Sequence, residues 1–512
     1  MSITLDAGGN EMNISVNRQS AISIKEQIRL EIAERIRSGL LEAGRPLPSV
    51  RQLAEQLNIS LVSAHQVYQA LQKDGLIESI RGKGTFIRCH PPVINETLEN
   101  GHNTTENPFD WQLSVSDYLP RASFWSQSAV RLPPEILDLS TASIHHSLLP
   151  LDLLQTSIKQ ALQRYSRSLG GYSPYQGDAE FVNVISDYLL SQGIFVHSHQ
   201  LIVTNGTQQA MDLFARTFLG AGDVIAMETP CFSGAIDVCR LSHATIQPVP
   251  VDQDGIRVDV LEELSTHMKI KVIYTVPTCQ NPTGSIMSLK RRRELIEFAE
   301  TNNVIILEDD PHRELAIPNK AGIKKLPPTL KSLDKTGRVV YLKGFSKFLF
   351  PGLRLGIMVA DGTIHNRLLA AKSIADLGSP LWLQKALVPL FSSSQLIKHI
   401  TKLNQALAQR STLVISTLSK DLNPLIRYNK YPGGMHLWLT LPLAISADDL
   451  IPQAHRQGIH FLPGSIFYPG EPELNHLRIC WTNLSDGDLP KALAILCKIL
   501  NKSVEDIRKG PC

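Results

Sequence analysis

The feature that most constrains the fold is a series of short β-branched runs separated by stretches long enough for a helix. The runs are Leu201-Ile202-Val203, Val224-Ile225-Ala226, Val272-Ile273-Tyr274 and Val304-Ile305-Ile306-Leu307. Such short, uniformly apolar runs are typical of strands buried on both faces of a parallel sheet, with crossover helices between them. The region from about residue 137 to 505 is therefore predicted to form an α/β domain with a mostly parallel sheet.

Polar residues follow these strands, at the edge where ligands of such sheets bind. The turn Asn205-Gly206-Thr207-Gln208 opens a helix, so its free backbone N–H groups can bind a phosphate. Phe232 follows the second strand, and its ring either stacks on a heteroaromatic cofactor or belongs to the core. Asn281 follows the third strand and can donate an amide hydrogen to a phenolate oxygen. Asp309 follows the fourth strand, where a carboxylate can keep a pyridine nitrogen protonated.

A fifth segment, Val340 to Gly356, carries a lysine and an arginine after an apolar strand. The strand ends in a polar turn that contains Lys347, and Arg354 follows the dipeptide Pro351-Gly352. A lysine at a strand end suits an amine nucleophile, and an arginine suits bidentate binding of a phosphate. The same two residues also fit a solvated turn, so this segment is informative only together with the other four.

Taken in order, the five motifs resemble those of the fold-type I pyridoxal 5′-phosphate (PLP) aminotransferases. The resemblance covers about residues 137 to 505, and implies a PLP-binding α/β domain with a small C-terminal α/β subdomain. It implies that Lys347 forms the internal aldimine and that Asp309 pairs with the pyridine nitrogen. It further implies that Asn281 binds the ring oxygen and that Phe232 stacks on the ring.

The resemblance also assigns residues around the rest of the cofactor and its substrate. The residues implied to hold the phosphate are Gly206, Thr207, Gln208, Ser346 and Arg354. Arg478, in Leu477-Arg478-Ile479, matches an arginine that binds a substrate carboxylate. Tyr172 matches a tyrosine that reaches the phosphate of the neighbouring subunit, which implies a homodimer.

Two positions depart from the family pattern. The family tyrosine three residues after the aspartate, which contacts the ring oxygen, is His312 here, and the serine three residues before the lysine is Gly344. Neither change removes an indispensable group, so we expect PLP to bind through a set that includes His312. Efficient transamination is less expected, because both missing hydroxyl groups contact the cofactor in the family.

The N-terminal region has a different, helical pattern. The apolar residues that recur every fourth position are Ile24, Ile28, Ile32, Ile36 and Leu40. A Ser49-x-x-Gln52 capping box opens a second helix, and Ser60 caps a third. Residues 76–87, with Gly82-Lys83-Gly84 at the tip, read as a hairpin. Residues 18–90 are therefore predicted to form an α+β winged helix-turn-helix.

This winged helix resembles the GntR type, through Pro46 to Ala54 and Arg81 to Ile87. The helix from Ser60 is expected to enter the major groove of an operator by its N-terminal end, while the wing approaches phosphate. The residues expected to contact double-stranded DNA are Ser49, Arg51, Ser60, Ser63, His65, Lys83 and Gly84. Where the family usually has Ser-Arg, this chain has Ser60-Leu61. The alternative is a helical protein-interaction module with the same packing.

Charge and composition agree with this division. Residues 18–90 carry 11 Lys or Arg and 7 Asp or Glu, a net charge of +4, against +3 for the whole chain. Only this segment therefore invites binding to a polyanion. The seven cysteines lack Cys-x-x-Cys pairs, so we expect no metal site and reduced thiols in a cytoplasmic protein. No signal peptide or membrane span is evident, and residues 91–136 are expected to form a linker.

A winged helix fused to an aminotransferase-like domain resembles the MocR subfamily of GntR regulators. The resemblance implies a PLP-dependent transcriptional regulator that senses an amino compound or PLP through an aldimine at Lys347. The first alternative is an aminotransferase acting on an amino acid, with an appended DNA-binding module. The second is a PLP-binding protein that has lost both activities.

Overall fold

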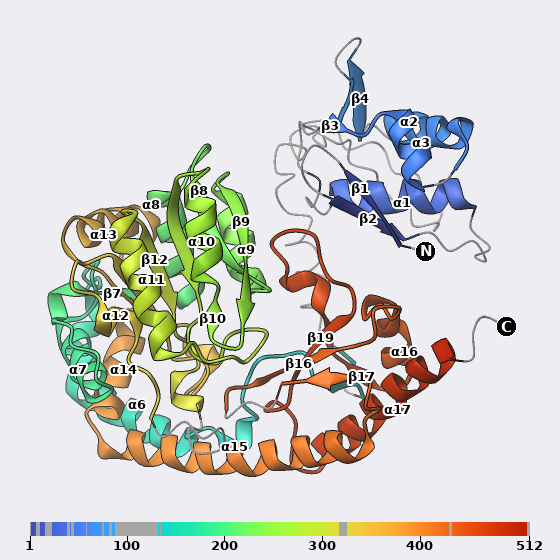
Figure 1. Ribbon diagram of the computed structural model, residues 1–512. Helices are drawn as coiled ribbons and strands as arrows, with labels where there is room; N and C mark the ends of the chain where they lie inside the picture. The colour runs from blue at the N-terminus through green and yellow to red at the C-terminus, as the bar shows by residue number, and fades with distance from the viewer. Residues whose placement is uncertain are drawn as a thin grey trace, which may run out of the picture. The chain divides into compact units, whose positions relative to one another are not determined.

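The computed structural model divides the chain into two compact units, Met1–Arg131 and Leu132–Cys512 (Figure 1). The residues that it describes are 2–6, 11–15, 23–37, 41, 46–57, 59–73, 76–80, 84–87, 132–133, 135–316, 325–429 and 433–508. The boundary between the units falls within the linker expected at residues 91–136, most of which lies outside the described residues.

The first unit contains a helix-turn-helix and a small antiparallel sheet. Its elements are α1 (Ile24–Arg37), α2 (Val50–Leu57), α3 (Leu61–Lys73), β3 (Pro46–Leu47), β4 (Ile77–Ile80) and β5 (Gly84–Ile87), in the sheet order β3-β5-β4. The predicted helices and hairpin are thus confirmed. A second hairpin, of β1 (Ser2–Asp6) and β2 (Glu11–Ser15), was not predicted.

The caps of α2 and α3 form as the sequence predicts. The Ser49 backbone N–H donates to Gln52 Oε1 at 2.9 Å, and the Gln52 N–H donates to Ser49 Oγ at 3.2 Å. The Ser63 N–H donates to Ser60 Oγ at 3.0 Å. The Tyr68 hydroxyl donates to the carbonyl of Pro48 at 2.6 Å, which ties α3 to the start of α2. The two helices therefore pack as one rigid motif around a shared apolar core.

The second unit is built on an eight-stranded sheet. Its strands are β7 (Leu201–Thr204), β8 (Val224–Thr229), β9 (Thr245–Asp252), β10 (Gly255–Ile256), β11 (Ile270–Thr275), β12 (Ile305–Asp309), β13 (Val339–Gly344) and β14 (Gly356–Val359). Their spatial order is β10-β9-β8-β11-β12-β13-β14-β7. The four predicted strands are present. The five neighbouring strands β9, β8, β11, β12 and β13 run parallel to one another, as predicted.

The other pairings are antiparallel, which the sequence did not predict. Strand β14 runs antiparallel to both β13 and β7, and β10 runs antiparallel to β9. The connection from β13 to β14 covers only residues 345–355. Because a parallel pair needs a longer crossover, usually with a helix, this connection returns the chain antiparallel. It carries Lys347 and Arg354, so the same short return places both residues at the strand end.

Helices cover both faces of the sheet (Figure 1). They are α6 (Leu151–Tyr165), α7 (Ala179–Ser191), α8 (Thr207–Phe218), α9 (Ser233–Leu241), α10 (Val258–Ser265), α11 (Leu289–Thr301), α12 (Leu330–Leu333), α13 (Gly362–Ala375) and α14 (Leu381–Phe391). Helices α8, α9 and α13 share an apolar core with one face. Helices α10 and α11 share a core with the other.

A smaller subdomain follows the large sheet, as the family resemblance implied. Its elements are α15 (Ser394–Asp421), β15 (Arg427–Tyr428), β16 (His436–Thr440), α16 (Ile451–Arg456), β18 (Leu462–Pro463), β19 (His476–Cys480) and α17 (Asp488–Arg508). Leu437 and Leu439 of β16 enter the apolar core with α15 and α17. Since side chains alternate along a strand, His436 and Trp438 lie on the opposite face.

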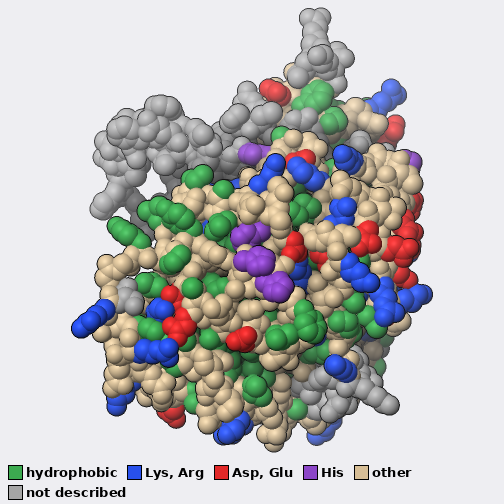
Figure 2. Space-filling view, turned by 90° about the vertical axis from the view of Figure 1, so that its left-hand side faces the viewer, with side chains coloured by type: hydrophobic (Ala, Val, Ile, Leu, Met, Phe, Trp, Pro, Cys, Tyr) green, Lys and Arg blue, Asp and Glu red, His purple; other side chains and the backbone are tan. Residues whose placement is uncertain are grey.

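No helix in the described residues is both long enough and apolar enough to cross a membrane. Charges of both signs alternate over the side of the second unit that Figure 2 shows. On that side there is thus no broad surface of one sign for a polyanion, in keeping with the small net charge outside residues 18–90.

Candidate functional site

Lys347 occupies the turn after β13 and is half-buried. Its Nζ donates to the carbonyl of Ala142 at 2.6 Å. Burial lowers the pKa of Lys347 to about 8, and the nearby cations Arg478 and Arg354 act in the same direction, against Cys480 and Asp309. The amine is still mostly protonated at pH 7, but its neutral fraction, which an amine nucleophile requires, is far larger than that of an ordinary lysine.

Asp309 ends β12 and is buried. Its Oδ2 accepts a hydrogen bond from the Tyr274 hydroxyl at 2.9 Å, while its Oδ1 has no partner among the described residues. Burial raises the pKa of Asp309 to about 7, although the Tyr274 hydrogen bond lowers it. A buried carboxylate oxygen without a partner is costly, so this atom is placed to accept a hydrogen bond from a bound ligand.

Asn281, which follows β11, and Arg478, on β19 of the small subdomain, are joined by a hydrogen bond. Arg478 Nη1 donates to Asn281 Oδ1 at 3.1 Å, and Nη2 donates to the carbonyl of Ser140. The guanidinium lies over the Phe467 ring at 5.0 Å, and its Nε has no partner in the described part of the chain. Burial lowers the pKa of Arg478 to about 10, so the group is still a cation at neutral pH.

The start of α8 forms a cradle with Arg354. Gly206 has φ of 85°, and a Cβ at this position would lie 3.1 Å from a guanidinium nitrogen of Arg354, so only glycine fits without strain. Arg354 is exposed, while Thr207 and Ser346 are half-buried. The Gln208 side-chain amide donates to the carbonyl of Gly234 at 3.1 Å. A helix N-terminus facing an arginine is a suitable site for a phosphate.

Phe232 caps α9 and shows features of both alternatives raised by its sequence. The ring is half-buried and packs against the core cluster behind α8 and α9. It also covers Gly234, where a Cβ would lie 2.6 Å from a ring carbon. The glycine therefore makes room for the ring at the mouth of the cradle, beside Gln208.

His312 is buried near Lys347, and neither of its ring nitrogens has a hydrogen-bond partner of good geometry among the described residues. Burial lowers its pKa to about 3; the Lys347 and Lys343 charges act in the same direction, and the Cys279 backbone acts against them. The His436 ring meets it edge to face at 5.2 Å, and burial holds the pKa of His436 well below its usual range. Both imidazoles are therefore neutral.

Three of these features were missed by the sequence analysis: Tyr274, His436 and a buried ion pair. Lys343 Nζ lies 2.5 Å from Glu314 and donates to the carbonyl of Asp310 at 2.9 Å. This second lysine of the segment is engaged and fully buried, so it does not compete with Lys347 as a free amine. The sequence did contain a signal for this ion pair, because a lysine inside an apolar strand must find a buried partner for its charge.

Tyr172 is not brought to this cluster within one chain. It lies between α6 and α7 with 92% of its side chain exposed, and its hydroxyl has no hydrogen-bond partner in the described ranges. The other cofactor residues named from the sequence come together from the ends of β7, β11, β12 and β13 and from the start of α9.

The candidate DNA contacts lie on the helix-turn-helix and the wing. Arg51 is exposed in the first turn of α2, beside the Ser49 cap, and His65 is exposed on α3. Ser63 is half-buried, and its hydroxyl pairs with that of Ser60 at 2.9 Å. Gly84 opens β5 with φ of 118°. Lys83 lies outside the described residues.

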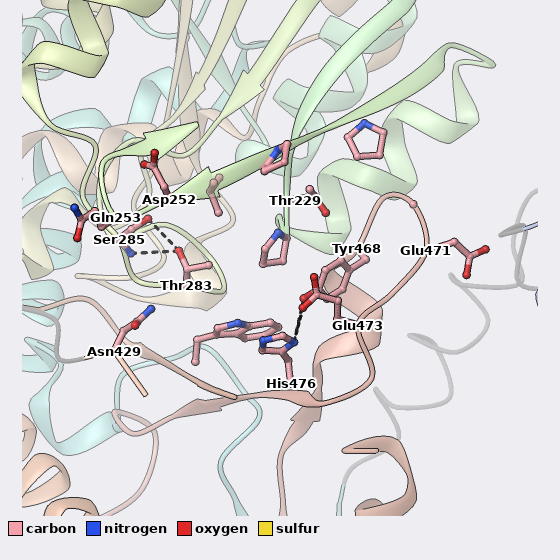
Figure 3. A pocket seen from close by; sticks show the side chains of 16 residues that line it. Thr229, Asp252, Gln253, Thr283, Ser285, Asn429, Tyr468, Glu471, Glu473 and His476 are labelled. Atoms are coloured by element: carbon pink, nitrogen blue, oxygen red, sulfur yellow. Dashed lines mark hydrogen bonds and ion pairs between the residues drawn. The ribbon is translucent and has the colours of Figure 1, made fainter. Parts of the chain in front are cut away.

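A separate cavity of about 570 Å³ lies between the ends of β8 and β9 and the loop after β18 (Figure 3). The Tyr468 hydroxyl lies 3.2 Å from His476 Nδ1, and Glu473 lies 3.5 Å from the same atom. None of Lys347, Asp309 and Arg478 lines this cavity.

Two families match the chain in separate regions. Residues 146–496 match the aminotransferase class I and II family, and residues 24–87 match the bacterial regulatory proteins of the gntR family. An uncharacterized HTH-type transcriptional regulator of Escherichia coli, YjiR, is 30% identical over 88% of this chain and 93% of its own. The probable rhizopine catabolism regulatory protein MocR of Rhizobium meliloti is 27% identical over 88% of both chains.

The second unit also resembles solved enzymes. The kynurenine aminotransferase of Pyrococcus horikoshii superposes with a TM-score of 0.70 and 27% identity, over 75% of this chain and 95% of that enzyme. The two regulators extend over both units, whereas this enzyme covers three quarters of the chain.

Proposed function

Since the chain belongs to the aminotransferase class I and II family and, through its GntR-type domain, to the MocR-like regulators, we propose that ligand binding at Lys347 controls its binding to DNA. The chain is a GntR-type transcriptional regulator fused to an aminotransferase-like domain, for which the fold implies PLP as the cofactor. The proposal concerns the residues that hold PLP and the ligand that it senses.

The single observation that carries the proposal is the pairing of Lys347 with Asp309. An amine whose pKa is lowered and a carboxylate with one unpartnered oxygen lie close enough that each shifts the pKa of the other. These are the two groups that PLP needs at opposite ends of its ring. The Gly206 and Arg354 cradle, with a glycine where a Cβ would meet the guanidinium, fits its phosphate. When bound, PLP supplies an aldehyde that condenses with amines and an electron-withdrawing ring.

The residues of this chain would divide the work as follows. Lys347 Nζ holds the cofactor covalently, Asp309 Oδ1 accepts the hydrogen of the ring nitrogen, and Asn281 donates to the ring oxygen with His312 nearby. Arg478 binds a carboxylate of the sensed amino compound. The residues proposed for the phosphate are Gly206, Thr207, Gln208, Ser346 and Arg354, with Phe232 on the ring and Tyr172 from a partner subunit of a homodimer.

We propose residues 18–90 as the DNA-binding domain, 91–136 as the linker and 137–505 as the sensing domain. The operator partner is double-stranded DNA with two short half-sites, whose centres lie about 10 bp or a multiple apart. The proposed DNA contacts are Ser49, Arg51, Ser60, Ser63, His65, Lys83 and Gly84. Arg51 and Lys83 would contact phosphate, so Ala at either position should reduce the salt slope of binding by roughly one unit.

Absorbance spectra of the purified protein test the sensing site. PLP should produce a visible band that common amino acids shift, and borohydride reduction followed by peptide mass mapping should place PLP on Lys347. Lys347→Ala should abolish the adduct and leave folding intact. An adduct at Lys343 would contradict the assignment.

The aminotransferase alternative makes a different prediction. With neutral His312 in place of a tyrosine, we expect slow or no formation of keto acid, and His312→Tyr should change the spectrum and raise the rate. Turnover of the unchanged protein at ordinary enzyme rates, about 1 to 1000 per second, with any common amino acid would favour an enzyme over a regulator.

A further inference from the structure

The first two residues of α3 are apolar and exposed. Leu61 is 56% exposed and Val62 is 66% exposed, whereas the opposite side of the same helix is buried in the core. A single exposed leucine needs no explanation. Here two adjacent apolar side chains are exposed, at the N-terminus of the helix that a helix-turn-helix presents to DNA. We therefore expect a partner for them in the DNA groove.

The polar groups of this turn are already in use. The Ser60 hydroxyl accepts the Ser63 N–H, and the two serine hydroxyls pair with each other at 2.9 Å. Ser63, expected from the sequence to read bases, is thereby drawn into the cap. One turn later the exposed residues are His65 and Gln66, which lie four positions after Leu61 and Val62 on the same rows of the helix.

The partner must therefore offer an apolar group to Leu61 and Val62 while being itself a polyanion. The major groove of B-DNA offers one such group, the 5-methyl of thymine. The net charge of +4 over residues 18–90 and the positive end of the helix favour DNA over an apolar protein surface. Neither Leu61 nor Val62 can donate or accept a hydrogen bond, so they distinguish bases only through this methyl group.

We propose that Leu61 and Val62 read thymine methyl groups, so that each half-site contains one or two thymines at fixed positions beneath the N-terminus of α3. This inference rests on the proposed DNA binding and adds its sequence preference. It also accounts for the absence of the usual arginine: the contact at Leu61 is apolar and independent of salt.

The test uses the full-length protein with PLP bound. A preferred duplex is first selected from a random library, and each thymine is then replaced singly by deoxyuridine, which removes only the methyl group. Burying one methyl or methylene contributes roughly fourfold in affinity, so one or two positions per half-site should each lose about that factor. The slope of affinity against salt should not change, because no phosphate contact is lost.

The double variant Leu61→Ala, Val62→Ala should bind the thymine and deoxyuridine duplexes equally well. Leu30→Ala is the matched control, because Leu30 is also an exposed leucine of this unit, on α1. That variant should keep the full preference for thymine. Circular dichroism checks that each variant is folded, and the substituted duplexes test the unchanged protein in any case.

Three results would overturn the inference. Affinity that is the same for every deoxyuridine duplex would exclude methyl reading while leaving DNA binding intact. A Leu61→Ala, Val62→Ala variant that still prefers thymine would assign the preference to other residues. A protein that binds no duplex even at low salt would refute the proposed DNA binding itself, which is a separate outcome.

Discussion

At the scale of single residues, the site depends on burial more than on direct ion pairing. Lys347 has a carbonyl rather than a carboxylate as its hydrogen-bond partner, and burial is the largest cause of its lowered pKa. Burial is also the largest cause of the raised pKa of Asp309. Burial thus moves both groups toward neutrality, and binding of a cationic ring nitrogen would restore the charge on the carboxylate.

The pH dependence of cofactor capture follows from the amine. Because the neutral form of Lys347 is the nucleophile and its pKa is lowered to about 8, the capture rate should rise from pH 6, be half-maximal near pH 8 and then level off. Stopped-flow absorbance measures this rate. Arg478→Met removes a cation that lowers the pKa of Lys347, so its midpoint should lie at higher pH. An unchanged midpoint would exclude Arg478 as a cause.

Tyr274 offers a sharp test of the carboxylate. Tyr274→Phe removes the donor to Asp309 Oδ2, and a hydrogen bond to a charged group contributes about 1.5 to 3 kcal/mol, so PLP should bind about tenfold or more weakly. Tyr341→Phe is the matched control, because Tyr341 is equally buried but donates to Asp310 at 3.1 Å. Equal losses in the two variants, measured by equilibrium dialysis, would show a general packing effect.

At the scale of elements, the site residues that could be predicted from the sequence are those at the junctions between strands and turns. Gly206, Asn281, Asp309 and Lys347 follow recognisable strands, so their order along the chain predicted their convergence. Tyr274 and His436 lie inside strands, where a tyrosine or histidine looks like any other side chain until the facing strand is known.

The antiparallel return of β14 was also hidden, because strand direction depends on the length of the connection rather than on the strand itself. The winged helix was more legible, since its caps are local. The surface proposed to contact DNA was less predictable, because the exposure of Leu61 and Val62 and the pairing of the Ser63 hydroxyl with that of Ser60 depend on how α3 packs.

The Ser49 cap sets the start of α2 and gives a prediction for this element. Ser49→Ala removes the acceptor for the Gln52 N–H and should destabilise the helix by about 1 kcal/mol. Hydrogen exchange in the full-length protein should show faster exchange of α2 amides and no change in β7 to β14. Ser79→Ala, on an exposed strand position of the same unit, should leave α2 protected; equal loosening would contradict a capping role.

At the scale of the whole molecule, the isolated position of Tyr172 predicts complementation between subunits. Tyr172→Phe and Lys347→Ala should each lose tight PLP binding when pure. Mixed dimers should regain one tight site, because a Tyr172→Phe chain keeps its own Lys347 and receives Tyr172 from the Lys347→Ala chain. Titration of PLP into co-expressed, doubly tagged dimers measures this. No recovery would show that Tyr172 acts within its own chain.

The segment from Ser140 to Ala142 gives this architecture a further consequence. The carbonyls of Ser140 and Ala142 accept hydrogen bonds from Arg478 and Lys347, respectively. These are the two side chains proposed to bind the carboxylate of a ligand and to react with the aldehyde of PLP. The same segment follows almost directly on the boundary between the two units. A carboxylate ligand and the aldehyde of PLP would therefore compete with this segment for Arg478 and Lys347, so we expect binding at the proposed site to free the backbone carbonyls of Ser140 and Ala142.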